Sequence, residues 1–457
     1  MTGRRRRQAP RALVALLGLA AFSTPALAHG GSLGSAGRQA VSVPTWLVLM
    51  TGGAAVGASF LLASFVTDRR LIEDVETWTH RLLDADAAVR ALATAVRVGG
   101  VALLVATLVV GAIGPQQPLA NAGLLFVWVG WWAGFTMSTY LLGNWWPALN
   151  PWRTVAGVLP TLDRTYPASL GVWPATAALL ALVWLEVASP VADAPDVLVG
   201  WVGAYTLVTL AGAVAFGEQW FDRADPVSRV FDHYGHVAPL SRTVDGIAAR
   251  LPGAGLRDLS LSNRSEVAFV VALLWVTTFD GFVATPAWAD IAAALTPTVP
   301  LVALYPLALG AGFGLFLGVF YGAARLSRGT AETYLTTPTL ARQFAPSLLA
   351  IAAGYHVAHY LGYFLSLAPA LAAVAATPLS PPATVELLVL PAWFETVGMT
   401  AILLGHLLAI WVAHGTAYDI FPGRLQAIRS QYPFIAVMVF YTMTSLWILA
   451  QPEVTPP

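Results

Sequence analysis

The sequence predicts an all-α fold, a polytopic membrane helical bundle of about ten transmembrane helices after a cleavable signal peptide. The first observation is composition, because 57% of the 457 residues are hydrophobic and only 11% are charged. A soluble chain carries about 25% charged residues. The second is a series of apolar runs of about 20 residues, the length that crosses a bilayer. The third is the position of the arginines between those runs.

The first 28 residues have the pattern of a secretory signal peptide. An arginine run (Arg4 to Arg7) precedes an apolar stretch from Leu13 to Phe22, and Ala26-Leu27-Ala28 matches an A-x-A cleavage site. The alternative is an uncleaved first helix. With cleavage, residues 29–457 form a single multi-helix transmembrane domain that begins at His29.

Ten apolar runs follow the signal peptide. They span residues 45–66, 95–114, 122–143, 167–188, 196–216, 265–284, 299–322, 344–366, 391–414 and 433–450. Past the signal peptide, the arginines lie in or border alternate connections, after the first, third, fifth, seventh and ninth runs, and only Arg38 falls outside this pattern. The positive-inside rule then predicts a multi-pass cell-membrane protein with the mature N-terminus and the C-terminus outside.

The composition also limits the partners. The formal net charge is +0 and there is no cysteine. No basic surface favours nucleic acid, and disulfides and thiolate sites are excluded. The expected partners are the lipid bilayer and a small ion or small-molecule ligand.

Two connecting segments resemble each other. "GNWWPALNPWR" (143–153) and the segment from Gly217 to Pro226 each follow a helix and contain Trp, then Asn-Pro or Asp-Pro. This indicates parallel repeats, and convergent interfacial chemistry explains it equally well. We expect residues 217–264 to form an amphipathic surface segment with a solvated His233. Glycines every four residues from Gly310 to Gly322 predict close packing against a neighbouring helix.

Polar side chains inside the apolar runs are functional candidates, because a charge at the bilayer centre costs about 2.5–3.5 kcal/mol on insertion scales. Glu186, Asp280 and Glu395 are expected near outer helix ends, where the cost is smaller. The remaining candidates are His356, His359, Tyr360, Tyr363, His406 and His414.

Helical spacing groups some of these candidates. His356 and His359 are three residues apart and share a face, which Tyr360 and Tyr363 extend. Glu395 and His406 are eleven residues apart, about three turns, and share a face of the next helix. Because consecutive helices are antiparallel, we predict one facing set.

That set of His356, His359, His406 and Glu395 predicts a transition-metal site for copper or zinc. Haem held by one histidine from each of two helices is a further option. The alternative is interhelical hydrogen bonds with no ligand. His29 would combine a terminal amine with its imidazole and chelate copper, and the alternative there is a solvated terminus.

Several stretches are similar to a family of prokaryotic integral membrane proteins labelled fenitrothion hydrolase-like. They are "AHG" after the signal, "LNPWR", "AHYLGYF", "AHGTAYDIF" and "RSQYPFIAVMVFYTMTSLWIL". The matching positions are His29, Asn150, Pro151, Trp152, His359, Tyr360, His414, Ser430, Gln431 and Pro433. The resemblance implies hydrolysis of an organophosphate triester. Gly415 stands where related chains have Asp, which weakens a chemical role for His414.

Three functions follow from these patterns. The first is binding, transport or handling of a transition metal at the histidine and carboxylate site. The second is a membrane-bound metal-dependent phosphotriester hydrolase, in which the metal lowers the pKa of bound water to about 7. The third is a structural membrane subunit with no bound metal. Nucleotide-binding and common hydrolase motifs are absent from the sequence, so whether the protein is an enzyme stays open.

Overall fold

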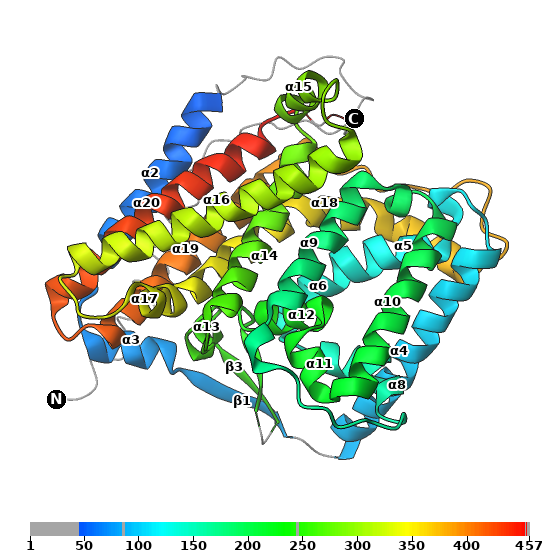
Figure 1. Ribbon diagram of the computed structural model, residues 1–457, viewed down its shortest axis with the longest axis horizontal. Coiled ribbons are helices and arrows are strands. Elements are labelled where there is room, and N and C mark those ends of the chain that lie inside the picture. Colours follow the sequence, from blue (N-terminus) through cyan, green and yellow to red (C-terminus); the bar gives the residue numbers. More distant parts are fainter. Residues whose placement is uncertain (1–44, 85–86, 244–245, 453, 455–457) are drawn as a thin grey trace.

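The computed structural model describes residues 45–84, 87–243, 246–452 and 454, and it is a bundle of membrane-spanning helices (Figure 1). The all-α prediction is therefore confirmed. The predicted signal peptide (1–28) and His29 lie outside the described residues.

Nine helical segments of the described chain are long and apolar enough to cross a membrane. They are α2 (Thr45–Ala63), α4 (Ala87–Ile113), the segment of α5 (Ala122–Leu125), π-helix η4 (Phe126–Phe135) and α6 (Thr136–Leu142), α10 (Pro195–Phe216), α14 (Arg264–Val283), α16 (Leu301–Thr330), α17 (Thr337–Phe344) running through η7 (Ala345–Ser347) into α18 (Leu348–Ala376), η8 (Ala392–Phe394) with α19 (Glu395–Ile420), and α20 (Arg424–Leu449). The remaining predicted run, residues 167–188, forms α9 (Trp173–Ala188), an apolar helix of 16 residues.

Short elements connect these helices. They are α3 (Arg69–Glu76), α7 (Trp146–Leu149), α8 (Pro151–Ala156), α11 (Glu218–Arg223), α12 (Pro226–Gly235), α13 (Ala254–Asp258), α15 (Pro286–Leu295), and the 3₁₀ turns η3 (Pro118–Ala120), η5 (Ala168–Leu170) and η6 (Pro190–Ala192). The strands β1 (Thr79–Asp84), β2 (Leu240–Thr243) and β3 (Gly246–Arg250) form an antiparallel sheet in the order β1-β3-β2.

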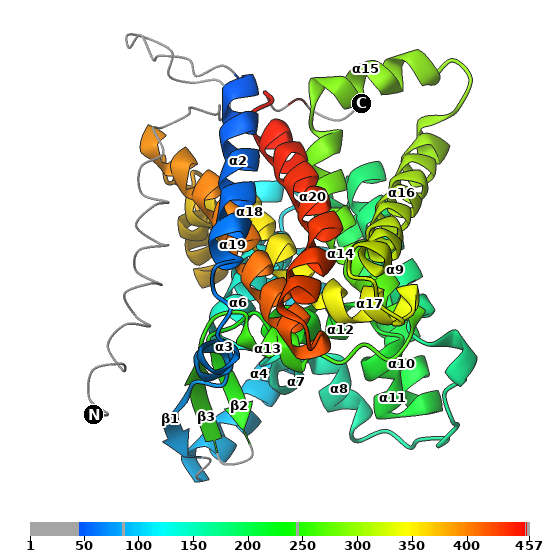
Figure 2. The same ribbon diagram turned by 90° about the vertical axis from the view of Figure 1, so that its left-hand side faces the viewer.

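The arginine-bearing connections lie together on one face of the bundle. Figure 2 shows the sheet, α3, α8 and α11 at one end and α15 with the C-terminal end at the other. Arg69 donates hydrogen bonds to the carbonyls of Tyr418, Phe421 and Pro422 at the end of α19. A cation at a helix C-terminus is stabilised by the helix dipole.

Helix α14 occupies the centre of the bundle, and most of its residues are buried. Peripheral helices have the reverse arrangement, since large apolar side chains such as Leu207 of α10 and Leu315 of α16 point outward with 73% and 63% exposure. Apolar side chains that point outward can be in contact with the hydrocarbon of a bilayer. This supports a multi-pass membrane protein.

The predicted packing of the α16 glycines is wrong for the described chain. A Cβ added at Gly310, Gly314, Gly318 or Gly322 meets no heavy atom within 4 Å. Gly312, on another face of α16, instead lies against the indole of Trp275. The helix therefore packs through Gly312, and the four-residue stripe faces away from the described bundle.

The two similar connections build the same local structure. Each starts at a glycine with positive φ, +82° at Gly143 and +61° at Gly217, a conformation that glycine adopts without steric cost. A short helix follows, and then a helix with Pro at its first turn and Asn150 or Asp225 as the N-cap. Both caps accept hydrogen bonds from backbone N–H groups, as capping side chains do.

The prediction that residues 217–264 lie on the surface is wrong for α12. Phe231 and His233 are fully enclosed, and Tyr234 is 1% exposed. Their rings pack inward against Phe135, Phe269 and Tyr140 respectively. The segment is held inside the protein because its aromatic side chains complete the core beneath η4 and α14.

Candidate functional site

A carboxylate, an imidazole and a phenol meet between α14 and α18. The Nε2 atom of His359 lies 3.3 Å from Oδ2 of Asp280, and the Tyr360 hydroxyl donates to the same oxygen at 3.0 Å. The side chains of His359 and Asp280 retain 28% and 21% exposure, so both are accessible. This acid–base cluster lies between two membrane-spanning helices. Asp280, expected to lie near the surface at little cost, is its common acceptor.

His356 has a different environment although it is one turn away. It is completely buried, and neither ring nitrogen has a hydrogen-bond partner in the described structure. Its ring lies 4.6 Å from that of Tyr360 and 5.6 Å from that of Trp132, measured between centroids. The predicted stripe on α18 therefore divides. His359 makes polar contacts, and His356 packs among aromatic rings.

The predicted partners on α19 do not complete a single ligand set. His406 is 1% exposed, and its Nδ1 lies 2.9 Å from the carbonyl of Ile402 in its own helix. Glu395 is the first residue of α19. Eleven residues at about 1.5 Å per residue separate the two by about 16 Å along the axis. They share a helix face, but one ion cannot contact both.

His414 and Tyr363 also have defined positions. Nε2 of His414 lies 2.9 Å from the Val66 carbonyl, and Nδ1 lies 3.3 Å from Oε1 of Gln431. The buried imidazole thus joins α19 to α20 and to the segment after α2. Tyr363 is 42% exposed, with its ring 6.3 Å from that of Tyr360.

An apolar cavity of about 210 Å³ lies beside the acid–base cluster. Residues of α4, η4, α9, α10 and α12 line it, and its wall contains six tryptophans, Trp128, Trp131, Trp132, Trp146, Trp152 and Trp201. Glu186 supplies the one acidic side chain of this wall. Its charge interacts with that of Asp280, so the carboxyl groups are neighbours. Trp132 also contacts Tyr360, at 6.2 Å between ring centroids.

The π-helix η4 brings the tryptophans into this wall. Ten residues from Phe126 to Phe135 adopt the wider helix inside a membrane-spanning segment. π-Helical geometry is rare and is frequent at functional sites. Trp128, Trp131 and Trp132 all line the cavity from this one segment. Apolar periodicity does not distinguish a π-helix from an α-helix, so the sequence could not predict this feature.

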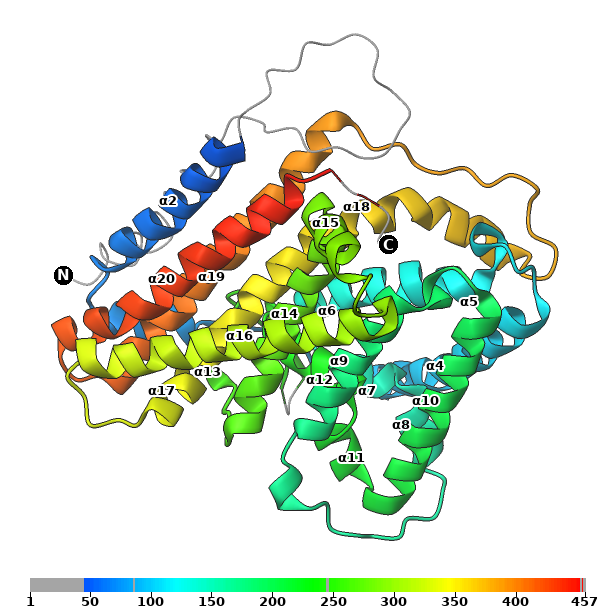
Figure 3. The same cartoon turned by 45° about the horizontal axis from the view of Figure 1, so that its top comes forward.

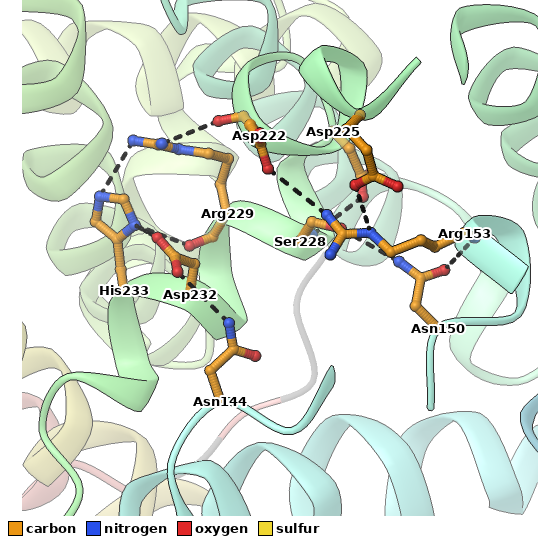
Figure 4. A network of polar contacts seen from close by, with 10 residues as sticks. Asn144, Asn150, Arg153, Asp222, Asp225, Ser228, Arg229, Asp232 and His233 are labelled. Carbon is orange, nitrogen blue, oxygen red and sulfur yellow. Dashed lines mark hydrogen bonds and ion pairs between the residues drawn. The ribbon is translucent and has the colours of Figure 1, made fainter. Parts of the chain in front are cut away.

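The floor of the cavity is built from the two similar connections, and a polar network joins them (Figure 4). Nε of Arg153 lies 3.2 Å from Oε2 of Glu218, and Nη2 of Arg153 lies 3.6 Å from Oδ1 of Asp222. Nδ2 of Asn150 donates to Ser228 at 3.3 Å. These contacts connect α8 with α11 and α12, beneath Trp146 and Trp152. Figure 3 shows α8 and α11 at the lower end of α10 and α12 beside α9.

Burial perturbs the titratable groups of this network. Burial lowers the pKa of His233 well below its usual range, and the nearby Arg229 cation lowers it further. Nδ1 of His233 lies 2.9 Å from the Arg229 carbonyl, while Nε2 faces the Arg229 guanidinium at 3.4 Å. This arrangement suits a neutral imidazole with its proton on Nδ1. Burial also raises the pKa of Asp222, and Arg153 partly opposes that shift.

The structure thus brings together some predicted residues and separates others. Asp280, His359 and Tyr360 lie close together, and Glu186 interacts electrostatically with Asp280. His356, His406 and His414 have separate surroundings. No group of three or more His, Asp or Glu side chains in the described ranges is arranged to hold a metal ion. The metal site stays a prediction, and His29 remains outside the described residues.

Comparisons with known proteins do not identify a relative. No family model, no curated protein and no solved structure gives a significant match to this chain.

Proposed function

We propose that this protein is a membrane transporter that couples movement of a small solute to protonation of Asp280. The supporting observation is the shared contact of His359 and Tyr360 with one carboxylate oxygen of Asp280, inside the membrane and beside a cavity. Intramembrane carboxylate and histidine groups form the proton relays of pumps and transporters. The arginine-bearing face is cytoplasmic in this proposal, in accordance with the positive-inside rule.

The neighbouring carboxyl groups provide a coupling mechanism. Asp280 and Glu186 interact electrostatically, and Glu186 lines the cavity. A proton or a cationic solute between two carboxylates offsets their repulsion. Binding of a solute at Glu186 would therefore change the free energy of proton binding at Asp280. His359 and Tyr360 orient Asp280 for proton exchange.

Transport also requires a gate that closes the cavity on the cytoplasmic side. The ion pairs of Arg153 with Glu218 and Asp222 cross between the two similar connections beneath the cavity. Their separation would open the floor, because α8 and α11 belong to different connections. We assign this floor as the inner gate.

Metal handling is the second candidate. Asp280 and His359 offer an oxygen and an imidazole nitrogen, ligands that suit zinc or copper. The same Asp280–His359 pair would act as a general base in a phosphotriester hydrolase, which the resemblance to fenitrothion hydrolase-like proteins implies.

One set of measurements separates these functions. Proteoliposomes on a solid-supported membrane are challenged with organic solutes, Zn²⁺ and Cu⁺ while charge movement is recorded. Nitrophenolate release from a fenitrothion-type triester is followed by absorbance. For a transporter, Asp280→Asn abolishes a solute-driven current that the exposed-site control Asp290→Asn retains. A response to metals alone, or triester hydrolysis alone, would favour the other candidates. Wild-type currents that persist in Asp280→Asn would refute the proposal.

A further inference from the structure

The cavity beside Asp280 presents aromatic carbon to its contents. The indole nitrogens of Trp128, Trp131 and Trp146 are enclosed and have no hydrogen-bond partner in the described structure. Trp152 donates its indole N–H to Thr206 at 2.9 Å. The four rings line the cavity, and their N–H groups are therefore not presented to it. These tryptophans therefore present ring carbon atoms and π-electrons to the cavity.

Two hydroxyl groups of the wall are occupied by hydrogen bonds within the protein. The Thr107 hydroxyl donates to the Leu103 carbonyl at 2.8 Å, and the Tyr205 hydroxyl donates to Asp225. In the described chain Glu186 makes no hydrogen bond or ion pair, and it interacts electrostatically with Asp280, Tyr360 and Tyr363. The wall thus offers one unpaired carboxyl group among aromatic and aliphatic surfaces.

The edge of the cavity reaches the apolar outer surface of the bundle. Trp201 and Leu182, on α10 and α9, line it and are 44% and 37% exposed. In a membrane this surface faces hydrocarbon rather than water. An occupant that enters there must be lipophilic. The volume of about 210 Å³ is below the roughly 300–1,000 Å³ typical of ligand pockets, which favours a small compound.

The charge of the wall selects among lipophilic compounds. An anion would find no cationic side chain among the lining residues. A metal ion would find one carboxylate and no imidazole there. An ionised carboxylate in apolar surroundings is costly without a partner, and a cation supplies that partner. Tryptophan faces attract cations, and aromatic cages recognise quaternary ammonium groups.

We propose that this cavity binds a lipophilic organic cation, such as a quaternary ammonium compound, with Glu186 as its counter-ion and the tryptophans as its cage. This names the solute class of the transporter and rests on the proposed function for its physiological meaning. The binding site itself depends only on the cavity wall.

Benzyltrimethylammonium and its uncharged carbon isostere neopentylbenzene test the proposal, because they differ in charge and hardly in shape. Each is titrated into purified protein in detergent while tryptophan fluorescence is recorded. We expect the cation to bind at least ten times more tightly than the isostere. Glu186→Gln should remove that preference and leave the affinity for neopentylbenzene unchanged. Asp193→Asn, an exposed carboxylate past the end of α9, is the matched control and should behave as wild type.

A second variant tests the proposal independently, in case Glu186→Gln does not fold. Trp201→Leu keeps the charge and removes one exposed aromatic face, and it should weaken cation binding by about 2- to 30-fold, the range of a cation–π contact. Equal affinity for the two compounds in wild type would overturn the proposal. So would an unchanged preference in Glu186→Gln.

The outcomes distinguish this inference from transport. Selective binding of the cation, without any Asp280-dependent current, would support the site and refute the transporter. Asp280-dependent currents with another solute class, without cation binding, would support transport and refute the site.

Discussion

The half of the bundle around α14 is closely packed, whereas the half around α4 and α10 encloses a cavity. In α14, 78% of the most apolar stretch is buried, compared with 17% in α4 and 22% in α10. In the packed half the backbones of α18 and α19 approach closely at Gly354 and Gly405. Asp280 belongs to the packed helix and Glu186 to the wall of the cavity, so the acid–base groups lie at the border between the halves.

This difference indicates that the two halves have different roles. A rigid half holds Asp280, His359 and Tyr360 in place, because catalytic and binding groups need support from packed elements. The other half supplies space and a gate. The variants below test that division, and they are ordered from the largest expected effect to the smallest.

Gly354→Val should prevent folding. A Cβ at Gly354 would lie 2.5 Å from the Ala401 carbonyl oxygen, where α18 crosses α19. Overpacking commonly costs about 1–3 kcal/mol, and a backbone neighbour cannot move away, so we expect more. Fluorescence-detected size-exclusion chromatography should show loss of the monodisperse peak.

Gly314→Val is the matched control on α16, where an added Cβ meets no atom within 4 Å. Its melting temperature should equal that of wild type. A similar loss in both variants would show that the glycine stripe of α16 packs against a partner.

The adjacent histidines should respond in opposite ways. His359→Gln should reduce Asp280-dependent transport at least 100-fold, because the imidazole contact with Asp280 is lost. His356→Phe should retain activity within twofold, since the His356 ring packs among aromatic residues and its nitrogens have no partner in the described structure. Transport currents and melting temperatures check both. If His356→Phe lost both activity and bound metal, the result would instead favour the metal site.

Acidification should destabilise the cavity floor through His233. Burial lowers the pKa of this imidazole in the folded state, so the unfolded state binds more protons once the pH falls below about 6.5. Stability is therefore fully present above that pH and declines below it, by up to about 2 kcal/mol at pH 5. Raised pKa values at Asp222 and Asp225 act in the opposite direction.

The contribution of His233 is isolated by comparing His233→Gln with wild type. The loss of melting temperature between pH 7.5 and pH 5 should be smaller in the variant. An equal loss in both proteins would assign the acid sensitivity to other groups.

Asn150→Ala should have the smallest effect, a loss of about 1 kcal/mol. The side chain caps α8 through the Arg153 N–H and donates to Ser228. Asn150→Asp retains the capping oxygen and should recover most of the stability in thermal unfolding. If Asp does not recover it, the contact with Ser228 matters more than the cap.

Local chemistry made much of this structure predictable. The helices follow from the apolar runs and the arginine pattern. The two similar connections follow from a turn glycine and an Asn-Pro or Asp-Pro pair, and all of these signals act over a few residues. The pairing of His359 with Tyr360 on one helix face was also visible. The contact with Asp280 was not, because 79 residues separate it from His359 in the sequence, and only the packing of α14 against α18 joins them.

The sequence by itself determined a multi-pass helical membrane protein, because hydrophobic length and arginine placement respond to the bilayer directly. Only the tertiary structure decided which polar groups meet. Three imidazoles of α18 and α19 ended in different surroundings: His359 on a carboxylate, His356 among rings and His406 on its own backbone. The physical reason is that membrane insertion depends on each segment alone, whereas a site depends on the rotation of neighbouring helices and on the width of η4.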